Sequence, residues 1–219
     1  MSAERKTKDD TADGAPPKVL VPRAGVRPRG FQRTDAWIFD LDNTLYPAEC
    51  NLFAQVDHRM GAFIAHYLGV PYAHARHLQK SYYRQFGTTL AGLMAVHKLD
   101  PAEFLAYVHD IDLSVVAEAP ELRAAIAALD GRRLIYTNGS RLHAERVASK
   151  LGVLDLFEDM PMNLAAPHDL GMTTVLVHSS YVDHPIQEQM KTWTELPDHI
   201  HHMTLDLVAF LRTAVGRRP

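Results

Sequence analysis

The sequence predicts an α/β protein built on a parallel β-sheet, with a block of helices inserted after the first strand. Two short apolar runs, Ala36–Phe39 and Arg133–Tyr136, each stop abruptly at polar residues. Buried parallel strands have this pattern where their carboxyl ends reach a site. Between the two runs there is almost no strand signal, and apolar residues recur at three- and four-residue spacing. The alternation of strands and helices over the rest of the chain favours a Rossmann-like core.

The inserted block is expected to contain four helices. The first is expected to end at Gly69, because glycine readily adopts the left-handed conformation that terminates a helix. Asp100-Pro101 is a start signal for the fourth, since proline is well tolerated at the first helical position. The expected helices cover residues 52–67, 72–86, 89–97 and 101–108.

The second half of the chain is expected to alternate between strands and helices. Helices are expected over 120–129, 142–151, 164–170 and 203–215. Strands are expected over 133–136, 153–157 and 173–178. In parallel sheets, ligands bind at the carboxyl ends of the strands. Three polar clusters fall at such ends: Asp40/Asp42, Thr137/Asn138 and Glu158/Asp159.

Composition defines the domain organisation and excludes several classes of partner. Residues 1–33 are rich in charged residues, glycine and proline and are expected to form a disordered leader. The core is expected over 34–45 and 120–219, and the helical insert over 46–119. A formal net charge of -3 gives no electrostatic reason for a nucleic-acid or membrane partner. The single cysteine, Cys50, excludes an internal disulfide and favours a cytoplasmic location. The oligomeric state is left open.

Asp40 and Asp42 are the first candidates for chemistry. On a straight strand both side chains, and that of Thr44, point to the same face. Two adjacent carboxylates repel each other unless a cation or a shared proton compensates. Mg²⁺ is the natural cation, because it prefers carboxylate oxygens and keeps waters for a substrate phosphate. One aspartate can then attack phosphorus while the other transfers protons.

The segment around these aspartates resembles the first motif of the haloacid dehalogenase-like hydrolases, and its particular residues are similar to those of the pyrimidine 5'-nucleotidase branch. The resemblance implies a magnesium-dependent phosphatase acting on a small phosphomonoester, with a pyrimidine nucleoside 5'-monophosphate as the leading substrate. It makes Asp40 the nucleophile and Asp42 the general acid/base. It also identifies the helical insert as the cap that closes over the site. The matching residues are Phe39-Asp40-Leu41-Asp42-Asn43-Thr44-Leu45-Tyr46-Pro47.

Two later strings resemble further motifs of the same family. Thr137-Asn138-Gly139 matches the second motif, which implies that Thr137 and Asn138 bind phosphoryl oxygens. Glu158-Asp159 matches the fourth motif and makes Asp159 a third magnesium ligand beside Asp40 and Asp42.

The sequence departs from the family pattern at the third motif, a lysine between the second and fourth motifs. Lys150 is the only lysine in that interval, near the far end of a helix and about 15 Å from the strand ends at 1.5 Å per residue. It is therefore expected to be a solvated helix residue. Arg141 lies closer and can offer a replacement cation, although its planar fork differs from the point charge of lysine. Loss of one charge-stabilising group is expected to slow catalysis by about 10²–10³.

The alternative function is a catalytically impaired relative that binds phosphate compounds or a protein partner. The missing lysine supports this alternative, and the intact Asp40, Asp42, Thr137, Asn138 and Asp159 support the enzyme. The histidines match no closed zinc pattern and are expected at the surface. They include His66, His74, His77, His97, His109, His199, His201 and His202.

Overall fold

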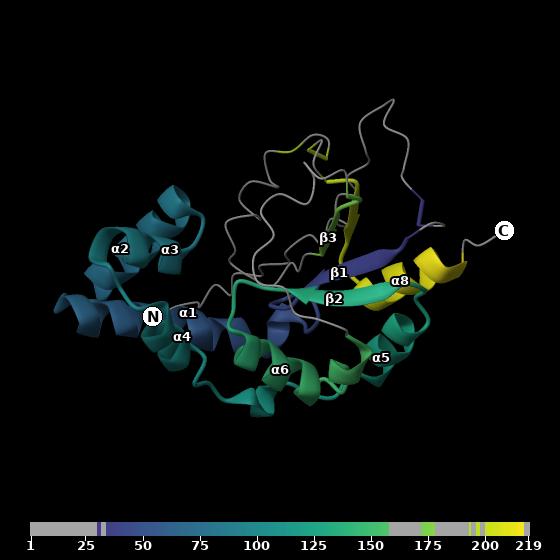
Figure 1. Ribbon diagram of the computed structural model, residues 1–219, viewed down its shortest axis with the longest axis horizontal. Coiled ribbons are helices and arrows are strands. Elements are labelled where there is room, and N and C mark those ends of the chain that lie inside the picture. The colour runs from purple at the N-terminus through teal and green to yellow at the C-terminus, as the bar shows by residue number, and fades with distance from the viewer. Residues whose placement is uncertain are drawn as a thin grey trace, which may run out of the picture.

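The computed structural model describes residues 30–31, 34–157, 172–177, 193, 196–197 and 200–216. Strands β1 (Ala36–Asp40) and β2 (Arg132–Tyr136) form a parallel pair at the centre of the molecule (Figure 1). Their register places Asp40 opposite Tyr136, so both strands deliver their following residues to the same edge. The predicted strands and their parallel pairing are confirmed, and with them the α/β class.

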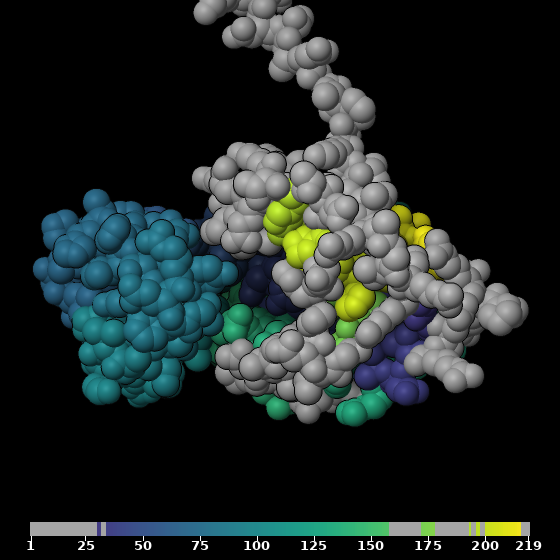
Figure 2. Space-filling model, turned by 90° about the horizontal axis from the view of Figure 1, so that it is seen from above, coloured from purple at the N-terminus to yellow at the C-terminus, as the bar shows by residue number. Residues whose placement is uncertain are grey.

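Helices α1 (Leu52–Leu68), α2 (Tyr72–Phe86), α3 (Thr89–His97) and α4 (Pro101–Val108) follow β1 and pack on one another. This group lies to one side of the sheet, and the space-filling view shows it as a separate lobe (Figures 1 and 2). Local signals set the ends of these helices. Gly69 ends α1 with a φ of 64°, and Asp100 caps α4 by accepting a hydrogen bond from the Ala102 N–H. The four predicted helices are confirmed, while the limits 46–119 for the insert stay a prediction.

Helices α5 (Pro120–Ala127) and α6 (Arg141–Lys150) flank β2 in the sequence, as predicted. Helix α8 (Leu207–Gly216) packs on α5 and begins four residues later than the predicted closing helix. The core between these elements is apolar and includes Phe39, Ile126, Ile135 and Leu211. Burial of these side chains supplies the main driving force that holds the helices on the β1–β2 pair.

The expected third strand, 153–157, is wrong. Residues Leu154–Leu156 form the 3-10 turn η3, and Phe157 packs edge-on against Phe39 with ring centroids 5.7 Å apart. A short apolar run fits either a strand or a buried turn, and here burial against β1 is achieved without strand pairing. The expected helix at 164–170 lies outside the described residues.

A second parallel pair consists of β3 (Val175–Val177) and β4 (His202–Thr204). Strand β3 confirms the prediction at 173–178 within the described residues, whereas β4 falls partly on the predicted closing helix. His201 bonds Thr174 through Nδ1, and the His202 ring lies 5.1 Å from that of Phe31. Both histidines are half-buried, so the surface prediction is wrong for them, while His199 lies outside the described residues.

None of the helices in the described part of the chain has the length and apolar composition that a bilayer crossing needs. The predicted leader, 1–33, lies outside the described residues except for residues 30–31.

Candidate active site

A tight turn immediately after β1 shapes the first part of the site. The backbone N–H groups of Thr44 and Leu45 both donate to the Leu41 carbonyl, at 3.3 and 3.0 Å. Asn43 takes a left-handed conformation with a φ of 56°, which asparagine tolerates better than most residues. The chain therefore turns back at Asp42 instead of continuing as a straight strand. The predicted common face for Asp40, Asp42 and Thr44 is wrong as strand geometry, although the turn still brings Thr44 to Asp40.

Asp40 lies at the carboxyl end of β1, where the residue is exposed to solvent. Protein atoms nevertheless crowd its carboxyl group, and this burial together with the nearby Asp42 charge raises its pKa from 3.8 to about 7. Hydrogen bonds from the Leu41 N–H and the Thr44 hydroxyl act in the opposite direction without cancelling the rise. The two carboxylates are therefore close enough to repel each other, as the sequence predicted.

Asp42 is held by two hydrogen bonds to one oxygen, Oδ1. The Tyr46 hydroxyl donates to it at 2.6 Å, and His143 Nε2 lies 3.2 Å away. Burial raises the pKa of the Asp42 carboxyl, but the bonds from His143 and Tyr46 outweigh that effect and lower it. Burial and the Asp42 charge raise the pKa of Tyr46, so its hydroxyl keeps its proton and remains a donor.

The loop after β2 lies at the same edge of the sheet. Thr137 is 3% exposed, and its Oγ1 accepts a hydrogen bond from the Gly139 N–H at 3.0 Å. That bond uses a lone pair of Oγ1, so the hydroxyl proton can be donated to a phosphoryl oxygen. Asn138 is exposed beside it. The structure thus brings Asp40, Asp42, Thr137 and Asn138 to neighbouring strand ends, and the fifth predicted residue, Asp159, lies outside the described residues.

Two histidines that the sequence did not assign to the site lie within it. His143 is 1% exposed on α6, and its ring stacks on that of His109 with centroids 4.3 Å apart and an interplanar angle of 12°. His109 is 8% exposed and bonds Ser140 Oγ through Nδ1 at 3.0 Å, so the surface prediction is wrong for it. His66, His74 and His77 are exposed, as predicted. Burial and the neighbouring His143 lower the pKa of His109 to about 4.

Gly139 lies where this loop packs closely against the two histidines. A Cβ atom at this position would lie 3.1 Å from a His143 ring carbon and 3.3 Å from Thr137 Oγ1. The absence of a side chain at Gly139 thus permits the close approach of this loop to His143 and Thr137.

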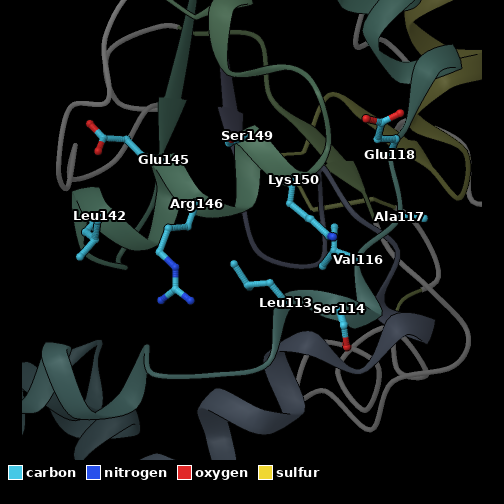
Figure 3. Close-up of a pocket in the computed structure, with 10 residues that line it drawn as sticks. All are labelled: Leu113, Ser114, Val116, Ala117, Glu118, Leu142, Glu145, Arg146, Ser149 and Lys150. Atoms are coloured by element: carbon cyan, nitrogen blue, oxygen red, sulfur yellow. The ribbon is translucent and has the colours of Figure 1, made fainter.

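Lys150 does not point to the strand ends. It is exposed on α6 and lines a groove of about 740 Å³ between that helix and the segment around Ser114 and Val116 (Figure 3). The pKa of Asp112 is lowered mainly by two hydrogen bonds from Ser114, and the charge of Lys150 adds a smaller contribution in the same direction. The prediction that Lys150 is a solvated helix residue is confirmed. Arg141 is exposed and donates to Glu145 at 2.8 Å, one helical turn away.

Comparison with known proteins gives a family match over more than half of the chain. A family model described as haloacid dehalogenase-like hydrolase matches residues 34–163. Phosphate metabolism protein 8 of Saccharomyces cerevisiae is 29% identical over 134 residues, which cover 56% of this chain and 41% of the yeast protein. The chain therefore spans less than half the length of that relative. A haloacid dehalogenase-like family hydrolase from Xanthomonas campestris aligns over 84% of this chain and 98% of its own, with 15% identity and a TM-score of 0.37.

Proposed function

The chain belongs to the haloacid dehalogenase-like hydrolases, and from that premise we propose that it is a magnesium-dependent phosphatase acting through Asp40. The observation that carries the proposal is the pair of mutually repelling carboxylates at the end of β1, beside the Thr137 loop at the end of β2. Such a pair suits a cation and a phosphoryl group better than it suits an uncharged substrate.

The proposed reaction has two steps. An oxygen of Asp40 attacks phosphorus, the bond from phosphorus to the leaving oxygen breaks, and Asp42 gives that oxygen a proton. Asp42 then takes a proton from water, whose oxygen attacks phosphorus and releases inorganic phosphate and the Asp40 carboxylate. Thr137 and Asn138 donate hydrogen bonds to the phosphoryl oxygens in both steps.

The donor set fits magnesium as far as the structure describes it. Asp40 supplies a carboxylate oxygen, which Mg²⁺ prefers, and Asp42 is proposed as a second ligand. A cation at this place would offset the Asp42 charge, which after burial is the second cause of the raised pKa of Asp40. Within the described residues, no group of three or more His, Cys, Asp or Glu side chains is arranged so that it could hold a metal ion. Asp159 is proposed as the third ligand. When bound, the ion supplies positive charge that offsets the carboxylates and the phosphoryl group.

The proposed substrate is a small phosphomonoester, with a pyrimidine nucleoside 5'-monophosphate as the leading candidate. The name of the yeast relative refers to phosphate metabolism, which agrees with a phosphate substrate. Several aromatic side chains of α1 and α2 are exposed and available for stacking on a base. They are Tyr67, Tyr72, Tyr83 and Phe86.

A second candidate function, that of a catalytically impaired relative, is favoured by the positions of Lys150 and Arg141, the two side chains that could replace the missing motif lysine. Lys150 lines the groove beside α6, and Arg141 is paired with Glu145. An impaired relative of this kind would bind phosphate compounds or a protein partner without turnover.

The test is phosphate release from nucleoside monophosphates and p-nitrophenyl phosphate, with Mg²⁺ and with EDTA. The wild type is compared with Asp40→Asn and with Asp155→Asn, which removes an exposed carboxylate on η3 that is paired with Arg123. We expect activity that requires Mg²⁺, is lost in Asp40→Asn and survives in Asp155→Asn. A folded but inactive wild type would refute the enzyme, and calorimetry with inorganic phosphate and nucleotides would then test the second candidate.

A further inference from the structure

We infer that His143 is a positioning residue for this reaction: it fixes the Asp42 carboxylate through Oδ1 and leaves the Oδ2 side for proton transfer to the leaving group. The inference rests on the proposed function, because it assigns a role within the same site. It concerns the orientation of the acid/base rather than the binding of phosphate.

The geometry at Asp42 is that of a carboxylate anchored from two directions. Tyr46 reaches Oδ1 from the turn that follows β1, four residues along the chain, and His143 reaches it from α6, 101 residues away. Neither bond uses Oδ2. Rotation of the carboxylate would lengthen both bonds together, so the pair of donors holds one orientation.

His143 is itself held more firmly than packing alone would require. Its backbone N–H donates to Ser140 Oγ at 3.2 Å, which fixes the residue in the first turn of α6. One face of its ring lies against His109, and the ring edge packs closely on Gly139, where an added Cβ would lie 3.1 Å from His143 Cδ2. A buried donor with so little freedom is suited to orient another side chain.

His109 connects this arrangement to the helical group. It is the residue immediately after α4, and its carbonyl accepts a hydrogen bond from Arg146 of α6 at 3.2 Å. Its Nδ1 bonds Ser140 Oγ, the same oxygen that caps His143. The chain leaving α4 is therefore fastened to α6 at the point where α6 orients Asp42.

The same contacts indicate positioning rather than direct catalysis. His143 is 1% exposed, and its Nε2 is directed to Asp42. An Nε2–H donor is present in the imidazolium and in one neutral tautomer, so the bond needs no particular charge on the ring. His143 would therefore act on the substrate only through Asp42.

Leaving-group dependence separates this role from a merely structural one. An alkyl phosphate such as a nucleoside 5'-monophosphate needs its leaving oxygen protonated, whereas p-nitrophenyl phosphate has a good leaving group and needs the acid far less. We expect His143→Leu to lower kcat/KM for the nucleotide by about 10- to 100-fold and that for p-nitrophenyl phosphate much less. His143→Gln retains an N–H at a similar reach and should restore most of the loss.

The matched control is His97→Leu, which removes a histidine bonded to Tyr82 within the helical group. It should leave the ratio of the two kcat/KM values at the wild-type level. Equal losses for both substrates in His143→Leu, or no rescue by His143→Gln, would overturn the inference while Asp40→Asn still supports the enzyme. If the wild type is inactive, the ¹⁵N resonance of His143 Nε2 remains decisive: it should shift in Asp42→Asn, and an unchanged resonance would overturn the contact.

Discussion

Replacing Asp40 by asparagine should stabilise the metal-free protein at pH 8 and leave its stability nearly unchanged at pH 4. Burial and the Asp42 charge raise the folded-state pKa of Asp40 from 3.8 to about 7. Between these two values the folded state binds more protons than the unfolded state, so stability falls as the pH rises. Above about pH 7 the full penalty of the ionised carboxylate is present, and below about pH 4 it is absent.

The size of the effect follows from the shift after allowance for solvent. A rise from 3.8 to about 7 corresponds to about 4 kcal/mol without screening. Because Asp40 is exposed, water and salt reduce that figure, and we expect about 1–2 kcal/mol. For a chain of this size each kcal/mol shifts Tm by about 2–4 °C, so Asp40→Asn should raise Tm by about 2–8 °C at pH 8.

The assay is thermal unfolding in EDTA at both pH values, followed by a Mg²⁺ titration at pH 8. Asp155→Asn is the matched control, and its effect on Tm at pH 8 should be opposite in sign. Arg123 holds the pKa of Asp155 below its usual range, so the ionised carboxylate stabilises the fold there. Added Mg²⁺ should raise the Tm of the wild type more than that of Asp40→Asn. The reasoning is refuted if Asp40→Asn gains nothing at pH 8, or gains as much at pH 4.

Three further substitutions test the site. Tyr46→Phe removes the 2.6 Å bond to Asp42 and should lower kcat/KM for a nucleotide about 10-fold, with a smaller loss for p-nitrophenyl phosphate. Gly139→Ala places a methyl group 3.1 Å from the His143 ring and should cost about 1–3 kcal/mol in urea unfolding. Thr137→Val leaves the Gly139 N–H without its acceptor and should cost about 1–3 kcal/mol, read from the same urea midpoint.

The parts of the fold that the sequence predicted well are those with local signals. Helices α2, α3 and α4 lie where predicted because their ends are set by neighbouring residues such as Gly87, Thr88 and Asp100. The third strand was predicted wrongly because a five-residue apolar run does not distinguish a strand from a buried turn. Strand β4 was missed because three residues paired with a strand 27 positions earlier leave no local pattern.

The candidate site also contains residues that the sequence predicted and residues that it missed. The residues predicted at the ends of β1 and β2 meet because the two strands are parallel neighbours, which the polar stops after the apolar runs already indicated. His143 was missed because its role depends on a contact with a residue 101 positions away. One local signal was present: Ser140 caps α6, and His143 stands in the first turn, directed back toward the loop. Among 13 histidines that signal alone did not single it out.

Asp40 holds a proton more readily than Asp42 does, whereas the proposed reaction requires an ionised Asp40 and a protonated Asp42. The pKa of Asp40 is raised and that of Asp42 is lowered, so a single proton shared by the two carboxyl groups resides on Asp40, the proposed nucleophile. In the proposed reaction, a divalent cation beside Asp40 would favour its ionised form, and a phosphate dianion beside Asp42 would raise the pKa of that acid. Cation and substrate together would therefore reverse the order, and the bonds from His143 and Tyr46 would keep Asp42 in place while it releases and regains a proton. Because both would be needed for this reversal, the proposed site would become competent for the reaction only with its phosphate ligand bound.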